Sequence, residues 1–267
     1  MKFYYALLLH LHKNKMPNIY TYPLAKSVVI SGDIHGDFEP LVFTICEQYD
    51  MRDTLVIVAG DCGFGFHAEG YYEQIFHRIQ KRLTAHNCWL AMVRGNHDDP
   101  SYFSAQKILH ERFRTIPDYS VISVSGHQIL CVGGAISIDR SWRLSEMQRH
   151  PGKQYYWQDE PAHYDVSLLD EITQTGIPID TVVTHTAPSF CEPLSKNGLA
   201  TWATHDPELL QDCDDERRQM DLLLRHLQSD HHPVKHWFYG HFHQSWYGEK
   251  DGILFRMLGI MELHELR

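Results

Sequence analysis

Residues 27–38 have the sequence SVVISGDIHGDF, an apolar, β-branched run that ends at a glycine and is followed at once by a carboxylate and an imidazole. A short Val- and Ile-rich run bounded by glycine predicts a buried strand. Asp33 and His35 are two residues apart, so in an extended chain their side chains point the same way. Gly-Asp turns are common, so this strand end gains meaning only if others resemble it.

Four more apolar runs end in the same way further along the chain. The predicted strands are residues 54–59, 88–93, 181–184 and 235–239, and the polar residues that follow them are Asp61, Asn96, His185, His241 and His243. Helix-like segments separate the first three runs, and this alternation predicts an α/β domain with a largely parallel sheet. In such sheets functional residues gather at the carboxyl edge of the strands, so we expect these side chains to converge.

The types of these side chains predict a metal site. Carboxylate oxygen, amide oxygen and imidazole nitrogen suit two divalent ions such as Mn, Fe or Zn. The seven candidate ligands are Asp33, His35, Asp61, Asn96, His185, His241 and His243. Two divalent ions outweigh the charge of two aspartates and one bridging hydroxide, so such a site stays positive and attracts phosphate. Hydrolysis of a phosphate ester is the natural chemistry.

Five short motifs resemble, in order, those of the calcineurin-like metallophosphoesterases. They are residues 32–36 (GDIHG), 60–61 (GD), 95–98 (GNHD), 184–185 (TH) and 240–243 (GHFH). The resemblance spans about residues 28–243 and implies a two-sheet α/β/β/α sandwich with the metals at the carboxyl edge of the strands. It implies one ion held by Asp33, His35, Asp61 and His243, and the other by Asp61, Asn96, His185 and His241. Asp61 would be the bridge between them.

The resemblance also gives His97 a role, because this histidine would not bind metal but would stand over the leaving group as general acid or charge stabiliser. The first and third motifs are similar to those of Ser/Thr phosphoprotein phosphatases and bacterial diadenosine tetraphosphatases. Their second motif normally continues to Asp-Arg-Gly, whereas Asp61 is followed here by CGFGF. The usual carboxylate partner of the histidine and one phosphate-binding arginine are therefore absent, and Asp98 or Asp99 are alternatives for orienting His97.

Three arginines are candidates for binding the substrate. Arg94 directly precedes the third motif, and its guanidinium fork can bind two phosphate oxygens at once. A surface salt bridge is the alternative for Arg94. Arg140 and Arg143 flank Trp142, a pattern that can hold a phosphate and stack a base. Alternatively, the aromatic residues of this stretch only pack it onto the core.

The chain of 267 residues shows no linker, so we expect one domain. Residues 1–26 are predicted to be an N-terminal extension and residues 27–267 a single calcineurin-like phosphoesterase domain. Irregular excursions from the core are expected at about residues 139–161 and 187–213, the second as a loop over the site. The first eleven residues, MKFYYALLLHL, faintly resemble a signal peptide, but histidines interrupt the apolar run; a structural extension, or initiation at Met16, is the simpler interpretation.

The overall composition limits the classes of partner that we expect. A formal net charge of −10 disfavours long nucleic acids and anionic membranes. The six cysteines include no CxxC pair, which suits a reducing cytoplasm, and no apolar stretch has transmembrane length. We therefore expect a cytoplasmic protein whose partner is a phosphorylated substrate, either a small molecule or a phosphoprotein. The oligomeric state is open.

The predicted function is metal-dependent hydrolysis of a phosphate ester, with a phosphomonoester as the first choice. The hydroxide between the ions would attack phosphorus, and His97 would assist the leaving group. A phosphodiesterase or exonuclease acting on nucleotides or nucleic acid is the alternative enzyme. A non-catalytic protein-binding scaffold is the alternative from another class, and its signature would be lost ligands.

The bridging role predicted for Asp61 can be tested against the role of His97. Asp61→Asn should remove bound metal together with activity, because the shared carboxylate would hold both ions. His97→Ala should lower activity but leave the metal content of the purified protein unchanged. Elemental analysis and an esterase assay measure the two quantities, and equal metal loss in both variants would contradict the assigned roles.

Overall fold

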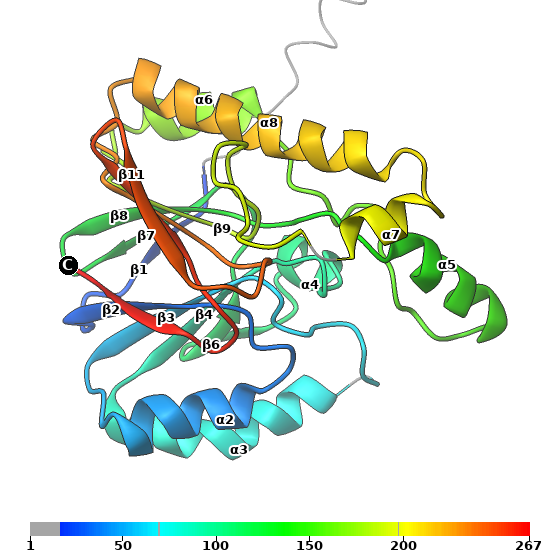
Figure 1. Cartoon of the computed structure of the whole chain (residues 1–267). Coiled ribbons are helices and arrows are strands. Elements are labelled where there is room, and N and C mark those ends of the chain that lie inside the picture. The colour runs from blue at the N-terminus through cyan, green and yellow to red at the C-terminus, as the bar shows by residue number, and fades with distance from the viewer. Residues whose placement is uncertain (1–16, 69, 197) are drawn as a thin grey trace, which may run out of the picture.

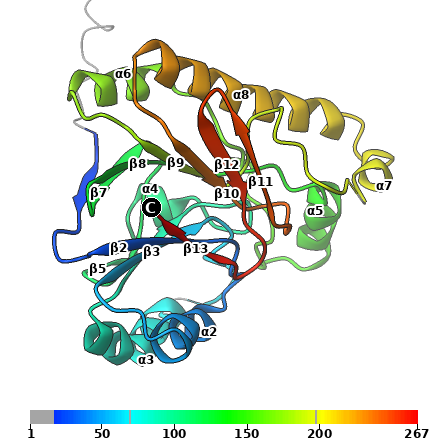
Figure 2. The ribbon, with the colours of Figure 1, turned by 60° about the vertical axis from the view of Figure 1, so that its left-hand side comes forward.

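The computed structural model of the chain describes residues 17–68, 70–196 and 198–267. Two β-sheets lie face to face, and helices cover the outer face of each, so that the layers follow the order α/β/β/α (Figures 1 and 2). This architecture confirms the predicted two-sheet sandwich. The segment with a faint resemblance to a signal peptide lies outside the described residues.

The six-stranded sheet has the order β13-β2-β3-β4-β6-β5 and contains the first three predicted strands. Its parallel strands are β2 (Ser27–Ser31), β3 (Thr54–Ala59), β4 (Trp89–Val93) and β6 (Phe113–Thr115), and its antiparallel edges are β13 (Leu263–Leu266) and β5 (Leu109–His110). Because β2, β3 and β4 are adjacent and parallel, the loops that follow them leave the sheet at the same edge.

The seven-stranded sheet has the order β1-β7-β8-β9-β10-β12-β11. Its strands are β1 (Ile19–Thr21), β7 (Ser120–Val124), β8 (His127–Val132), β9 (Thr181–Thr184), β10 (His236–Tyr239), β11 (Trp246–Lys250) and β12 (Ile253–Met257). Strands β8, β9, β10 and β12 run parallel to their neighbours in this group. The edge strand β1 pairs with β7 and lies within the stretch predicted as an extension.

Two groups of helices cover the sheets (Figures 1 and 2). The six-stranded sheet is covered by α2 (Phe38–Phe43), the π-helix η1 (Thr44–Gln48) and α3 (Tyr71–His86), and the seven-stranded sheet by α6 (Val166–Gln174) and α8 (Leu209–Ser229). The connections contain α4 (Ser101–Ser104), α5 (Arg140–Arg149) and α7 (Leu199–Ala203). Both views place α5 and α7 at the same end of the sandwich. Among the described residues, no helix combines the length and apolar character needed to span a membrane.

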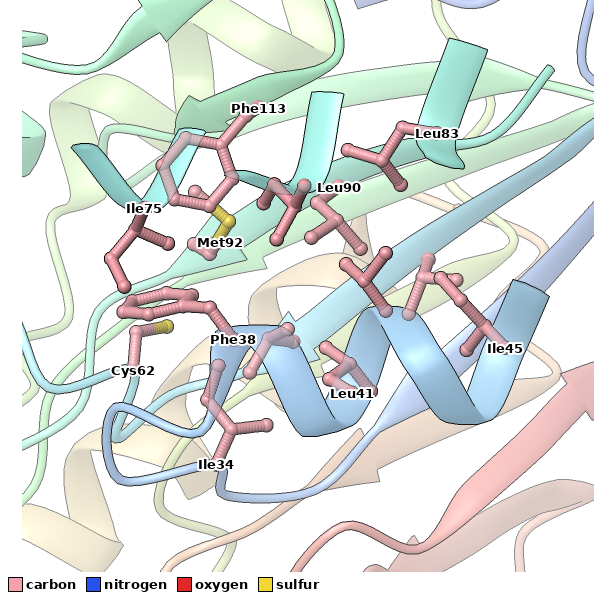
Figure 3. Close-up of a cluster of buried hydrophobic side chains, with 14 of the residues drawn as sticks. Ile34, Phe38, Leu41, Ile45, Cys62, Ile75, Leu83, Leu90, Met92 and Phe113 are labelled. Atoms are coloured by element: carbon pink, nitrogen blue, oxygen red, sulfur yellow. The ribbon is translucent and has the colours of Figure 1, made fainter. Parts of the chain in front are cut away.

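The alternation of side chains along each strand fills two apolar layers at once. In β2, Val29 packs with the helices outside the sheet, whereas Val28 and Ile30 pack between the two sheets. The apolar runs without polar interruption are therefore explained by burial on both faces. Figure 3 shows the outer layer, in which Phe38 and Leu41 of α2 face side chains of the sheet.

The core under α2 allows a matched test of this packing. Phe38 is fully buried, with its ring centroid 5.3 Å from that of Phe64 and 5.4 Å from that of Phe113. Phe38→Ala should lower the free energy of unfolding by about 3–5 kcal/mol, because a cavity remains where the ring was. Phe43 lies on the same helix but is 47% exposed, so Phe43→Ala should cost less than about 1 kcal/mol. Urea denaturation measures both values, and equal losses would contradict the packing described.

Candidate metal centre

Each candidate ligand lies in the short loop that directly follows a strand. Asp33 and His35 follow β2, Asp61 follows β3, Asn96 follows β4, His185 follows β9, and His241 and His243 follow β10. Both sheets thus contribute, and their parallel strands bring all seven side chains to one place, as expected from the strand ends. The hydrogen bonds and distances among them form two sets.

The first set of donors gathers around Asp33. Nε2 of His243 lies 3.0 Å from Asp33 Oδ2 and 3.1 Å from Nε2 of His35. His35 also approaches Asp61, with Nδ1 3.9 Å from Asp61 Oδ2. One donor atom from each of these four residues lies within 4.8 Å of all the others, so a single ion can contact all four.

The second set of donors meets at the side-chain oxygen of Asn96. Nδ1 of His241 and Nε2 of His185 lie 2.9 and 3.1 Å from Asn96 Oδ1. Nε2 of His185 also lies 3.1 Å from Oδ1 of Asp61. Asp61 therefore offers one oxygen to each set, which is the geometry that a bridging carboxylate requires.

The backbone of this centre is strained in a way that brings the loops close together. His35, Asp61, His241 and His243 all have left-handed φ angles, of 46°, 47°, 68° and 52°. Such angles are uncommon outside glycine and concentrate at functional sites. Gly60 has a φ of 96°, and a Cβ atom there would overlap the ring of His185. A glycine before Asp61 is thus needed for the two sheets to contribute to one centre.

Buried polar atoms in both sets fit a bound cation. Asp33 is completely buried, and within residues 17–68, 70–196 and 198–267 its Oδ2 receives no hydrogen bond of acceptable geometry. Nδ1 of His185 donates to the carbonyl oxygen of Ala59, 2.7 Å away, so Nε2 faces the oxygens of Asp61 and Asn96 and needs a proton or a metal ion between them. The oxygen and nitrogen donors suit Mn, Fe or Zn.

The electrostatics of the centre also fit a bound cation. Burial by itself would raise the pKa of Asp61, but the nearby histidines, above all His185, hold it well below its usual range. Burial would likewise lower the pKa of His185, yet the carboxylates of Asp61 and Asp33 raise it to about 10. Both shifts show that Asp61 and His185 stabilise each other's charged forms, and a metal ion, which carries more charge than a proton, can take the place of the proton on Nε2 of His185.

His97 lies at the edge of the two donor sets. Its backbone N–H donates to Asp61 Oδ1 at 2.7 Å, and its ring lies edge-on to that of His35, with 5.2 Å between centroids. Nη2 of Arg143 lies 2.5 Å from Nε2 of His97. Burial, opposed by Asp61 and supported by the charge of Arg143, lowers the pKa of His97 to about 4. The ring is therefore neutral near pH 7, and Nε2 accepts a hydrogen bond from Arg143.

Arg143, predicted to bind substrate, is held firmly in this position. It extends from α5, is 5% exposed and donates from Nε to Asp139 Oδ1 at 2.7 Å. Its Nη1 reaches the carbonyl oxygen of Tyr155 at 3.4 Å. The first predicted excursion thus folds back and places a cation beside His97.

Arg94, also predicted to bind substrate, has its donors committed within the protein. It is only 4% exposed, so it is not a surface residue, and Nη2 pairs with Asp118 at 2.9 Å. The two Nη atoms also donate to the carbonyl oxygens of Gly133, Asp159, Glu160 and Pro161 at 2.6–3.3 Å. These contacts fasten both ends of the segment that carries α5, and they leave Arg143 as the better candidate for contact with a phosphate.

Arg140, the third predicted arginine, faces acidic residues instead. Its Nε lies 2.5 Å from Asp206 Oδ2, and its Nη2 lies 2.6 Å from Asp212 Oδ2. These ion pairs connect α5 to the beginning of α8. Trp142 is 49% exposed, so it does not pack the excursion onto the core, whereas Trp157 is buried.

The two carboxylates proposed as partners of the His97 ring have other roles. Asp99 accepts a hydrogen bond from the backbone N–H of Ser101 at 2.9 Å. Asp98 accepts four backbone N–H groups at 2.7–3.0 Å, those of Cys62, Gly63, Phe64 and Gly95. Asp98 therefore ties the loop that follows Asp61 to the loop that contains Asn96.

Two buried residues near the centre are not identified by the sequence analysis. Asn96 Nδ2 donates to Ser137 Oγ at 3.0 Å, and Ser137 Oγ donates to Glu160 Oε2 at 2.8 Å. The available signal was position: Ser137 follows β8, and His185 follows β9, the parallel neighbour of β8. Nothing in the local sequence indicates Glu160.

A family model described as calcineurin-like phosphoesterase matches residues 26–245 of the chain. No curated protein matches the chain. The matched residues include both donor sets, His97, and the segment with Ser137, Arg143 and Glu160.

The solved structures that match the chain share little sequence with it. A protein of Thermus thermophilus is 12% identical, with a TM-score of 0.47, and the match covers 89% of this chain and 91% of that one. Phosphopantetheinyl hydrolase from Mycobacterium tuberculosis is 13% identical, with a TM-score of 0.46 and coverage of 91% and 96%. A dimetal phosphatase from Danio rerio is 13% identical, with a TM-score of 0.43 and coverage of 90% and 89%.

Proposed function

Because the chain belongs to the calcineurin-like phosphoesterases, and is therefore a metal-dependent hydrolase of phosphoric esters, we propose that its substrate is a phosphomonoester of modest size. This phosphorylated partner is a small molecule or a phosphoprotein side chain. We assign the seven side chains of the two donor sets as metal ligands, with Mn, Fe or Zn as the ions. We also propose that the protein is cytoplasmic and that residues 27–267 form one catalytic domain.

The contact between Arg143 and His97 beside Asp61 carries this proposal. Asp61 belongs to both donor sets, and its Oδ1 also holds the backbone of His97. A cation therefore lies directly next to the expected position of the metals. A phosphate group bound to the metals would have Arg143 within reach of its remaining oxygens.

The protein groups can bind and orient such a substrate without moving far. Asp139 and the Tyr155 carbonyl fix the guanidinium of Arg143, so little side-chain freedom is lost when it binds a phosphate oxygen. Because Nε2 of His97 accepts from Arg143, the proton of the neutral ring is on Nδ1, and we assign this N–H to the leaving-group oxygen. When bound, the divalent ions supply an activated water and polarise the phosphoryl oxygens.

The distribution of positive charge supports a single phosphate group. Arg94 and Arg140 are committed to partners in the protein, and of the three predicted arginines Arg143 is the one at His97. A long polyanion needs a row of cations along its path. The net charge of −10 also disfavours nucleic acid. A phosphodiesterase or exonuclease remains the alternative that the first experiment addresses.

A pair of chromogenic substrates tests the substrate class. With Mn²⁺, Fe²⁺ or Zn²⁺ supplied separately, kcat/KM for para-nitrophenyl phosphate should exceed that for bis-para-nitrophenyl phosphate by about tenfold or more. A chelator should abolish both activities. A clear preference for the bis-ester would overturn the assignment to monoesters. Absence of any esterase activity from a fully metal-loaded protein would support the scaffold alternative.

Substitution of Arg143 tests its contact with the substrate. Arg143→Ala should lower kcat/KM for the monoester by about 100-fold, because a fixed donor to the phosphate is lost, while metal content stays unchanged. Arg143→Lys should recover only part of the loss, since a point charge replaces the planar fork. Arg149 lies on the same helix and pairs with Glu146 in solvent, so Arg149→Ala is the control and should stay within about twofold of wild type. A loss below about threefold for Arg143→Ala would contradict the role.

A further inference from the structure

We propose that Ser137 and Glu160 are positioning residues that determine which atom of the Asn96 side chain faces the metals. This inference rests on the proposed function, because it takes Asn96 as a metal ligand. Ser137 and Glu160 are 1% and 0% exposed, and they connect Asn96 to the segment that carries Arg143.

The orientation of the Asn96 amide is a real choice for the protein. An asparagine presents either its oxygen or its NH₂ group after half a turn of the amide, but only the oxygen can bind a cation. Nδ1 of His241 and Nε2 of His185 both lie within 3.1 Å of this position. A ring nitrogen that carries no proton accepts a hydrogen bond from an NH₂ group, so Nδ1 of His241 can pair with the reversed amide, which would then place its NH₂ group where the metal binds.

Three hydrogen bonds supply the constraint. Glu160 accepts from the backbone N–H of Ser137 through Oε1 at 2.6 Å and from its hydroxyl through Oε2 at 2.8 Å. An ionised carboxylate can only accept, so the hydroxyl must donate to it and offers only its lone pairs to Asn96. Asn96 therefore directs its NH₂ group to Ser137, 3.0 Å away, and its oxygen to the histidines. The direction of the relay originates in the charge of Glu160.

The charge of Glu160 depends on the balance between its burial and the positive groups around it. Burial and the neighbouring Glu216 raise the pKa of Glu160 to about 8, while its hydrogen bonds from Ser137 and the charge of Arg143 oppose the rise. Cations bound at the oxygen of Asn96 would add positive charge on the same side, which would lower this pKa again and favour the carboxylate. Nη1 of Arg94 donates to the backbone carbonyl oxygen of Glu160 at 2.6 Å, so the carboxylate of Glu160 stays within reach of Ser137.

Exchange of Glu160 for its amide tests the direction of the relay with little change of shape. In Glu160→Gln the new NH₂ group donates to the Ser137 hydroxyl, which is then free to donate to Asn96 and to reverse its amide. Metal affinity, measured by competition with a chromogenic chelator, should fall about 10- to 100-fold. Ser137→Ala removes the relay and should also weaken binding. Because both substitutions act through one chain of hydrogen bonds, the double variant should lose no more metal affinity than the single variant with the larger loss.

A matched control and a measurement of folding separate positioning from stability. Glu146→Gln makes the same exchange on α5, outside the relay, and should retain wild-type affinity within about twofold. Metal-free Glu160→Gln should unfold cooperatively; if it does not fold, Ser137→Ala alone decides. Wild-type affinity in Glu160→Gln or, in that event, in Ser137→Ala would overturn the proposal, as would additive losses in the double variant. A wild-type protein that binds no metal would instead overturn the proposed function, and the relay with it.

Discussion

The burial of two neighbouring carboxylates, Asp33 and Asp61, is the constraint on which the centre depends. Buried charges of the same sign lose hydration and repel each other, so they require positive partners. His185 supplies one, with Nε2 3.1 Å from Asp61 Oδ1, and its pKa is raised accordingly. Divalent ions would supply more charge than a proton can. Metal binding by the proposed ligands would therefore be coupled to the local stability of all five strand-end loops, because these side chains come from both sheets.

Much of the frame and of the centre follows from the sequence. Uninterrupted β-branched runs predict strands buried on both faces, and β3 and β9 have the predicted bounds. The convergence of their polar termini follows from parallel pairing, since parallel strands end at one edge. The sandwich itself came from the family resemblance, because strand runs alone do not say how they divide between two sheets. The boundaries of helices were less predictable: α8 begins at Leu209, within the second predicted excursion.

The orientation of individual side chains could not be predicted, because it depends on contacts distant in sequence. Arg94 is adjacent to the GNHD motif, yet its side chain finds carbonyl groups some 40 and 65 residues further along the chain. Arg140 and Arg143 are three residues apart on α5, but one meets Asp206 and the other meets His97. The same holds for Glu160, whose partner Ser137 is 23 residues away. Left-handed φ angles at four residues of the two donor sets are likewise a tertiary effect, imposed by the packing of the loops.

Arg94 and Glu160 hold the two ends of the segment from Gly133 to Pro161 in place. Arg94 binds carbonyl oxygens on both sides of it, at Gly133 and Pro161, and Glu160 closes back onto Ser137. The two ends of this segment are thus held to the rest of the fold mainly by hydrogen bonds to its backbone groups. These bonds do not depend on the side chains between the two ends. We expect the part of this segment between Ser137 and Glu160 to accept new lengths and new sequences while the sheets and the metal donors stay in place. Evolution, or a protein engineer, can then change substrate choice in this fold by exchanging one loop without rebuilding the catalytic centre.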